Sequence, residues 1–419
     1  MARIFADLTP LRASAPYRRL FIGLGVSNIG QQMTSVAVAL QVYDLTKSSF
    51  MVGLVGLFQL IPLIGFGLYG GTLSDAFDRK LVGLISALGL WGCSILFLLQ
   101  SALAINSVGV LFLVVAIQSA FFAVGNPARQ AIVPRLVPTQ MLPAANALSM
   151  ITWNIGFTVG PLIGGIVIAA FGTVTAAYVI DVIAFAILVW AMWRLPSLPP
   201  ILIPGDARPR AGWSAVKEGF VFLKGKRNLQ MSFYEDIIAM VFGMPRALFP
   251  AIAALWYGGS MREVATVLGF LAAAPAVGAL LSSVFSGRLG LVRAQGRWVV
   301  ISIVVWGTAI AAFGLVRWLP LALLFLVIAG AADNVSAIFR TTILQAATPD
   351  EYRGRLQGVF TVVVAGGPRL GDVEAGAVAA LAGEAFAVVS GGVACVVLAL
   401  GLSRAVPSFW RYDARHPIP

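Results

Sequence analysis

Long uninterrupted runs of apolar residues alternate with short polar segments along almost the whole chain. Each run is about 20 residues long, the length at which an α-helix crosses the hydrocarbon core of a bilayer. The runs are continuous and rich in Leu, Ala, Val and Gly, whereas strands of a membrane barrel alternate in polarity over about ten residues. The pattern therefore predicts an all-α membrane protein with about twelve transmembrane helices. They cover approximately residues 20–42, 50–73, 81–101, 107–128, 143–170, 174–193, 230–256, 264–287, 297–316, 319–339, 357–382 and 385–404.

The longest polar break covers residues 195–229 and separates six predicted helices from six. We therefore expect an N-terminal six-helix bundle over 1–194, a cytoplasmic linker over 195–229 and a C-terminal six-helix bundle over 230–419. The second part of the linker has apolar residues at helical spacing, which predicts a short amphipathic helix lying along the inner membrane face. A solvated linker with a chance apolar stripe is the alternative. The stripe consists of Trp213, Val216, Phe220 and Leu223.

An internal repeat relates the two halves. The segment RQAIVPRLVP begins at Arg129, and RTTILQAATP begins at Arg340; the same spacing pairs Pro138 with Pro349 and aligns glycines of the fifth and eleventh predicted helices. Six helices separate the copies, so both have the same orientation in the membrane. This is the parallel-repeat arrangement of two-bundle transporters.

Composition and charge agree with a membrane protein. Hydrophobic residues make up 59% of the chain, charged residues only 11%, and the mean hydropathy is +0.92. The net charge of +12 would also suit a nucleic-acid partner. However, most of the 29 Lys and Arg residues lie in alternate polar segments, which the positive-inside rule assigns to the cytoplasm. We therefore expect both termini in the cytoplasm and no nucleic-acid partner.

The chain lacks the residues that several kinds of chemistry require. Cys93 and Cys395 both fall in predicted spans, and His416 is the single histidine, so no disulfide framework and no metal site are predicted. The sequence contains no phosphate-binding G-x-x-x-x-G-K-[ST] loop and no G-x-S-x-G nucleophile turn. We predict no enzyme activity and no cofactor. An ion gradient, most simply of protons, remains as the energy source for transport.

One short segment concentrates charge in this apolar chain. GGTLSDAFDRK, residues 70–80, is predicted to form the inner loop between the second and third helices. With Gly71, Asp75, Arg79 and Lys80 it resembles the loop signature of the major facilitator superfamily. The resemblance implies that the Asp and Arg latch two bundles together on the cytoplasmic side; a merely topogenic loop is the alternative. The second half has Leu291 where the Asp would be, so any latch is asymmetric.

The fifth predicted helix carries GFTVGPLIGG, in which Gly156, Gly160 and Gly164 recur every four residues. Such a smooth face lets another helix pack closely, and Pro161 weakens the local backbone hydrogen bonding and favours a bend. The segment resembles the glycine-proline motif of antiporters in the same superfamily. Close packing without a role in coupling is the alternative.

Ionisable residues within predicted spans are candidates for function, because each costs about 2.5–3.5 kcal/mol to insert. We expect Glu235 and Asp236, near the inner end of the seventh helix, to reach water, and Arg246, near its centre, to line a cavity. A structural salt bridge is the alternative for Arg246. Candidates for carrying the coupling proton are Asp372, Asp181, Asp333 and Glu235. Candidates for contacting substrate, with interhelical hydrogen bonding as the alternative, are Asn28, Gln31, Trp153 and Arg246.

The chain as a whole is similar to the branch of the superfamily that contains the enterobactin (siderophore) exporter and drug efflux proteins. The similarity rests on NPARQAIVPRLVP (126–138), RALFPAIA (246–253) and ILQAATPDEYRGRLQGV (343–359). It implies export of a siderophore or similar bulky amphipathic compound in exchange for protons, by a monomer in the bacterial inner membrane. One departure is that the fourth helix has Gln118 where many proton antiporters carry a central Arg. A multidrug efflux antiporter is the second reading, and a passive channel or substrate sensor is the third.

Overall fold

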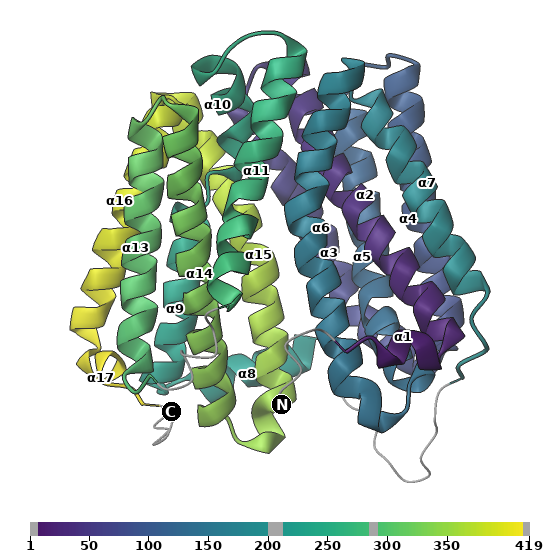
Figure 1. The fold of residues 1–419 in the computed structure, drawn as a ribbon. Coiled ribbons are helices and arrows are strands. Elements are labelled where there is room, and N and C mark those ends of the chain that lie inside the picture. Colours follow the sequence, from purple (N-terminus) through teal and green to yellow (C-terminus); the bar gives the residue numbers. More distant parts are fainter. Residues whose placement is uncertain (1–6, 200–212, 285–291, 414–419) are drawn as a thin grey trace. The chain divides into compact units, whose positions relative to one another are not determined.

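The computed structural model describes residues 7–199, 213–284 and 292–413. Within these ranges every regular element is a helix, so the predicted all-α fold class is confirmed (Figure 1). The chain divides into two compact units. The N-terminal unit comprises Met1–Leu45 and Phe58–Gly212, and the C-terminal unit comprises Thr46–Leu57 and Trp213–Pro419.

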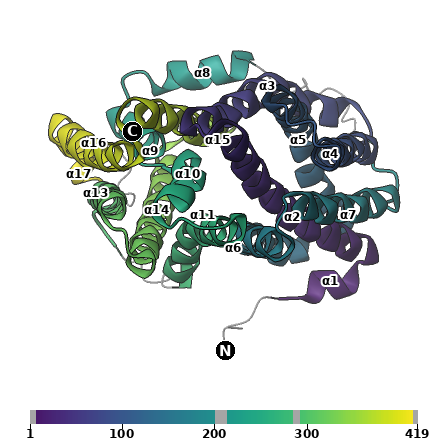
Figure 2. The same ribbon diagram turned by 90° about the horizontal axis from the view of Figure 1, so that it is seen from above.

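In the first half of the chain, α4 packs against both α5 and α7, and these three helices lie side by side in Figures 1 and 2. Ser107 caps α5 by accepting a hydrogen bond from the Val110 amide at 3.4 Å. Gly172 ends α6 in the left-handed region at φ +71°, a conformation that favours glycine. The elements are α1 (Thr9–Ala13), α2 (Ala15–Thr46), α3 (Ser49–Ala76), α4 (Arg79–Ala102), α5 (Val108–Leu136), η1 (Thr139–Met141), α6 (Leu142–Phe171) and α7 (Thr175–Trp193).

In the second half, α13 packs against α14 and α16, and α11 packs against α14 (Figure 2). The helix expected as the seventh span is interrupted and consists of α9, η2 and α10. The elements are α8 (Trp213–Leu223), α9 (Arg227–Phe242), η2 (Arg246–Leu248), α10 (Phe249–Trp256), α11 (Met261–Val284), α13 (Gln295–Leu315), α14 (Leu319–Ala347), α15 (Asp350–Ala382), α16 (Glu384–Ala405) and α17 (Pro407–Trp410).

Among the described residues, ten helices are long and apolar enough to cross a membrane. The other two predicted spans correspond to α2 and α15, which have 32 and 33 residues and therefore exceed the length needed. Their composition differs from that of the ten because polar side chains interrupt the apolar run. Such residues include Asn28 and Gln31 in α2, and Arg369 and Asp372 in α15. Polar side chains within a membrane protein face its interior, where other groups can satisfy them.

Three glycines of α6 lie against α2 within the N-terminal unit. A side-chain carbon at Gly160 would lie 2.5 Å from Gln32 Cβ, and one at Gly164 would lie 3.1 Å from Met33 Cα. The position at Gly156 is occupied by the Asn28 amide group. Pro161 lies inside α6, which is assigned as one helix from Leu142 to Phe171. The smooth face predicted from the four-residue spacing is therefore the surface on which α2 packs.

The first turns of α3 belong to the C-terminal unit and pack on α15 and α16. Ser49 Oγ donates a hydrogen bond to Glu384 Oε1 at 3.0 Å. A side-chain carbon at Gly56 would lie 3.3 Å from Arg369 Cα, and the one at Gly376 would lie 3.0 Å from Phe50 Cα. Both helices therefore use glycine where their backbones approach each other.

Helix α8 lies across the direction of α15 and contacts it near the end of α15 at which that helix begins (Figures 1 and 2). The Phe222 and Tyr352 rings stack with their centroids 4.2 Å apart. Leu223 is buried, whereas Phe220 of the predicted apolar stripe is exposed. The side chains of Trp213 and Val216 lie outside the described residues. The short helix expected in the linker is therefore present, and its position along the inner membrane face stays a prediction.

Candidate functional site

A cavity of about 620 Å³ opens within the N-terminal unit. Its walls come from α2, α4, α5, α6 and α7, and they combine aromatic rings with amide and hydroxyl groups. Such a mixture suits a ligand with both apolar and polar parts, and the volume falls in the range of pockets for drug-sized molecules. The polar lining residues are Tyr17, Ser27, Asn28, Gln31, Asn126, Arg129, Gln130, Asn146, Ser149, Thr152 and Asn154.

Three of the four predicted substrate-contacting residues line this cavity. Asn28 is buried and donates from Nδ2 to the Trp153 carbonyl at 3.3 Å and to the Thr152 carbonyl at 3.4 Å, so it also ties α2 to α6. Gln31 lies one turn further along α2. The Trp153 side chain is 48% exposed, and its ring lies 5.1 Å from that of Phe157. Residues distant in sequence are therefore brought together by the α2–α6 packing.

The same cavity contains an arginine that the sequence reasoning misplaced. The apolar run of the fourth helix ends at residue 128, so Arg129 was assigned to the cytoplasmic segment that follows. The structure continues α5 to Leu136, and Arg129 is only 7% exposed. Its Cζ lies 5.5 Å from the centroid of the Phe122 ring, a cation–π distance. Its counterpart in the sequence repeat, Arg340, is misplaced in the same way, because the tenth predicted helix ends at residue 339 whereas α14 continues to Ala347.

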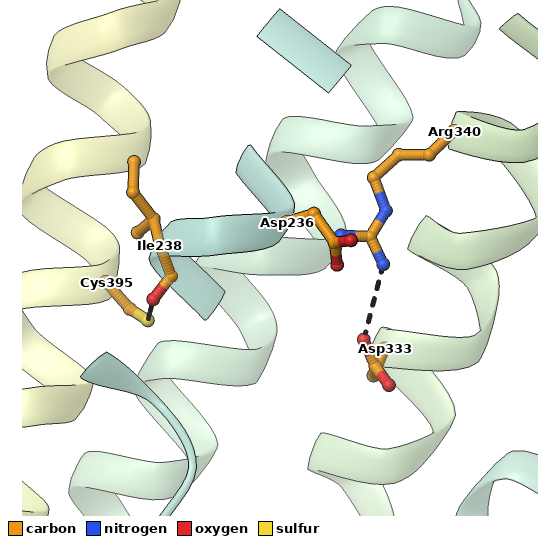
Figure 3. Close-up of polar contacts among 5 residues, drawn as sticks. All are labelled: Asp236, Ile238, Asp333, Arg340 and Cys395. Atoms are coloured by element: carbon orange, nitrogen blue, oxygen red, sulfur yellow. Dashed lines mark hydrogen bonds and ion pairs between the residues drawn. The ribbon is translucent and has the colours of Figure 1, made fainter. Parts of the chain in front are cut away.

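A second polar cluster lies inside the C-terminal unit, where Arg340 of α14 binds two carboxylates (Figure 3). One nitrogen of its guanidinium pairs with Asp236 of α9, and the other lies 3.6 Å from Asp333 Oδ1. Asp236 and Arg340 are buried. Two acidic groups therefore neutralise one buried cation, as buried charges require. Behind Asp236 on the same helix, the Ile238 carbonyl accepts a hydrogen bond from Cys395 Sγ at 3.3 Å.

Glu235 lies beside this cluster and is 0% exposed. Neither of its carboxylate oxygens has a hydrogen-bond partner in the part of the chain that the structure describes. The expectation that Glu235 and Asp236 reach water is therefore wrong. Residues 227–242 form a helix enclosed by α13, α14, α15 and α16, so the distance from the helix end does not determine exposure.

Arg246 lies in the break of the seventh helix, not near the middle of a continuous one. Helix α9 ends at Phe242, and Pro245 precedes the single turn η2 that begins at Arg246. Proline cannot donate the backbone hydrogen bond that would continue the helix. From this break, Arg246 Nη2 reaches Asp372 Oδ2 of α15 at 3.4 Å. The salt bridge weighed for Arg246 is therefore present, and Arg246 does not lie among the residues that line the N-terminal cavity.

Asp181 lies apart from both sites. It is 0% exposed on α7, and Ser94 Oγ of α4 donates to its Oδ2 at 2.7 Å. A side-chain carbon at Gly30 of α2 would lie 2.7 Å from Oδ1, so the carboxylate is enclosed where three helices meet. Asp181 therefore joins helices inside the N-terminal unit.

The charged motif at residues 70–80 is mostly helix instead of loop. Helix α3 continues to Ala76 and α4 begins at Arg79, so the turn consists of Phe77 and Asp78. The surroundings of Gly71 and the side chain of Asp75 lie outside what the structure describes. The Arg79 amide donates to the Leu198 carbonyl at 3.2 Å, and its Nη1 donates to the Ala131 carbonyl at 3.4 Å.

Asp78 is the acidic residue that organises this turn, and sequence reasoning overlooked it. Its Oδ1 caps α4 by accepting a hydrogen bond from the Lys80 amide at 2.8 Å. It also accepts from the Leu198 amide at 3.1 Å and from Ser197 Oγ, which attaches the start of the linker. Burial alone would raise the pKa of the Asp78 carboxyl, but these hydrogen bonds outweigh it and hold the pKa below the ordinary 3.8.

No group of three or more His, Cys, Asp or Glu residues is placed to hold a metal ion within the described ranges. The N-terminal unit contains a cavity of mixed polarity that could bind a ligand. The C-terminal unit contains buried acidic side chains paired with an arginine.

Solved structures with this fold are transporters. A nucleoside transporter NupG variant superimposes with a TM-score of 0.76 at 16% identity, covering 93% of this chain and 100% of the other. A bacterial homologue of the lysosomal transporter Spinster gives 0.72 at 16% identity, with 97% of each chain covered. A D-xylose–proton symporter gives 0.71 at 13% identity, covering 95% of this chain and 99% of the other. The chain therefore shares the fold of these three transporters.

Fold and cavity together define a multi-pass membrane transporter of small molecules. The chain belongs to the transmembrane secretion effector family, whose profile matches residues 5–416. It is 27% identical over 415 residues to the enterobactin exporter EntS of Citrobacter koseri, covering 99% of this chain and 97% of the relative. The EntS protein of Shigella boydii serotype 18 is 29% identical over 378 residues, covering 90% and 88%. Family and relatives are transporters and not enzymes, as the sequence predicted.

Proposed function

We propose that the protein exports a siderophore or similar bulky amphipathic compound from the cytoplasm in exchange for protons, by alternating access. The observation that carries the proposal is the cavity of the N-terminal unit, whose volume of about 620 Å³ accommodates a molecule of drug size. Trp153 and Phe122 offer apolar surfaces, while Asn28, Gln31 and Asn154 offer hydrogen-bonding groups. A compound with aromatic rings and several polar oxygens matches this lining.

The relatives support the same cargo class. EntS proteins bear the name enterobactin exporter, and the similarity extends along nearly the whole chain. Enterobactin is therefore the first compound to test. The second candidate, efflux of lipophilic cationic drugs, would call for acidic groups facing the cargo. Within the described residues, no Asp or Glu lines the cavity.

A proton gradient is the energy source that we propose. Glu235 supports this role because its carboxyl group is fully buried beside the Arg340 cluster and has no hydrogen-bond partner among the described residues. Asp372 and Asp333 are further candidates, but each has an arginine within 3.6 Å that favours its charged form. Asp181 is a weaker candidate because it is not among the residues that line the cavity, and Ser94 Oγ donates a hydrogen bond to its carboxylate.

We further propose a bacterial inner-membrane location, cytoplasmic termini and a monomer that works without a cofactor. The basic residues of the polar segments support the orientation. The motif with Gly71, Asp75, Arg79 and Lys80 is proposed to control closure of the cytoplasmic side. If so, Asp75→Asn changes the rate of transport while the equilibrium affinity for cargo stays within about twofold. The reason is that the motif would act on the interconversion of conformational states and not through contacts with the cargo.

The decisive experiment uses the purified full chain in lipid vesicles with an acidic lumen. We expect enterobactin to accumulate inside, and the accumulation to collapse when an uncoupler dissipates the gradient. Vesicles without protein provide the control. Equal entry with and without the gradient would point to a passive channel. Accumulation of a lipophilic cationic dye but not of enterobactin would favour drug efflux and contradict the proposal.

A further inference from the structure

Arg129 places one buried positive charge at the wall of the N-terminal cavity. The residue is only 7% exposed, and it nevertheless lines the cavity. Within the described residues it forms no salt bridge and no hydrogen bond, and its Cζ lies 5.5 Å from the centroid of the Phe122 ring. A guanidinium carries five N–H donors and stays charged, so a buried one calls for acceptors.

The repeat supplies a comparison within the same chain. Arg129 and Arg340 begin the two matching segments, and both are buried in the helix that occupies the same place in its half. Seven residues before Arg340 stands Asp333, one of its two carboxylate partners. Seven residues before Arg129 stands Phe122. The position that provides an anion in the C-terminal unit therefore provides an aromatic ring in the N-terminal unit.

Phe122 interacts with the guanidinium without neutralising it. A ring attracts the cation through its π face, which leaves the N–H groups at the edge of the guanidinium available for a planar anion. The other polar residues that line the cavity, among them Asn126, Gln130, Asn146 and Ser149, are neutral. The local charge therefore remains positive and the wall offers additional donors beside it.

We propose that Arg129 binds a carboxylate of the cargo, in the place of the carboxylates that Arg340 finds within its own unit. This inference rests on the proposed export function and adds to it the chemical class of the cargo and the residue that selects it. A carboxylate presents two oxygens in a plane, which suits two parallel N–H donors of one arginine.

The test is equilibrium binding to the purified full chain, with two probes that differ in charge. 2,3-Dihydroxybenzoate carries a carboxylate, and 2,3-dihydroxybenzamide is its neutral counterpart. We expect the wild type to bind the benzoate at least about tenfold more tightly, the increment of a charge-assisted hydrogen bond. Arg129→Gln should abolish the preference, and Arg129→Lys should retain part of it.

Two further variants make the result specific. Arg135→Gln removes a charge from the same helix, where Arg135 Nη1 donates to the Pro199 carbonyl outside the cavity at 3.4 Å, and should leave the preference unchanged. Phe122→Asp keeps Arg129 but gives it the neighbour that Arg340 has, and should abolish the preference. This second route tests the inference even if Arg129→Gln does not fold.

Equal affinity of the wild type for both probes would overturn the inference, as would an intact preference in either Arg129→Gln or Phe122→Asp. Binding requires no gradient, so the result is separate from the transport assay. Selective binding without gradient-driven export would contradict the proposed function and leave the anion site standing. Export without selective binding would support the proposed function and contradict the anion site.

Discussion

Arg246 Nη2 lies 3.4 Å from Asp372 Oδ2, so the interrupted seventh helix is joined to α15 by an ion pair at its break. The break removes backbone hydrogen bonds that a continuous helix would make, and such gaps in membrane helices occur where protein or water satisfies the freed groups. The arginine side chain is 45% exposed and the aspartate 16%, so the pair is partly accessible.

This pair should make a measurable contribution to stability. We expect Arg246→Gln and Asp372→Asn each to lower the thermal stability of the purified protein, and the double variant to lower it by less than the sum. The coupling energy should be about 1 kcal/mol, because the exposure of Arg246 weakens the attraction. Thermal unfolding in detergent measures all four members of the cycle. Strict additivity would mean that the two side chains do not interact.

Close packing of α6 on α2 predicts a strong effect of added volume at Gly160. Gly160→Val should destabilise the protein by about 1–3 kcal/mol or prevent its folding, because the new side chain overlaps Gln32. Gly92→Val in α4 is the matched control, since a carbon there meets nothing within 4 Å. Yield and thermal stability in detergent provide the comparison. If both substitutions were tolerated equally, the α2–α6 packing would have to be looser than described.

The hydrogen bonds of Asp78 predict a dependence of stability on pH. The pKa of Asp78 is lower in the folded protein than the ordinary 3.8, so its contribution is fully present above pH 3.8 and is lost as the pH falls through the folded value. Asp78→Asn cannot ionise and lacks this contribution at every pH. The difference in thermal stability between wild type and variant should therefore be constant from pH 7 to about pH 4 and shrink below it.

A matched substitution separates charge from capping at the same residue. Asp78→Ala removes both and should cost about 1–2 kcal/mol, the usual loss for a helix cap. Ser197→Ala removes one donor to the carboxylate and should have a smaller effect in the same direction. An Asp78→Ala variant as stable as the wild type would show that the turn between α3 and α4 holds without its cap.

Glu235 and Asp181 make opposite predictions for coupling. Glu235→Gln should fold and still exchange cargo across vesicle membranes without a gradient, but should lose gradient-driven accumulation, because the amide cannot release a proton. Asp181→Asn should fold and retain accumulation, since its hydrogen bond from Ser94 Oγ can be kept by an amide oxygen. Accumulation by Glu235→Gln at the wild-type level would exclude Glu235 as the proton carrier.

Most helices followed from the sequence because the length and continuity of apolar runs reflect the thickness of the bilayer. The hydropathy pattern fails where a single side chain, and not the average hydropathy of a window, determines where a helix ends or breaks. Arg129 was assigned to the end of its helix because hydropathy treats any arginine as a stop, whereas α5 continues for seven residues beyond it. The break before Arg246 was missed for the opposite reason, since Gly243, Met244 and Pro245 are apolar enough to leave the window unchanged.

The site was predictable in part. Asn28, Gln31 and Trp153 were found because amides and indoles are unusual in long apolar helices, and each lines the cavity. The burial of Glu235 was not predictable, because it depends on which helices surround α9 and not on the sequence of α9. Asp75 is one of the positions that define the motif, whereas Asp78 is not. The motif therefore pointed to Asp75 and gave no reason to select Asp78.

The glycine contacts between α6 and α2 have a consequence for evolution. Both helices contribute to the cavity, and where they meet the glycines of α6 lie directly against Asn28, Gln32 and Met33 of α2. Changes in what the protein carries are therefore most easily made by exchanging the amide, aromatic and basic side chains on the inner wall while the scaffold stays the same. Diversification within this family would then leave the glycines in place and vary the residues one or two positions away from them.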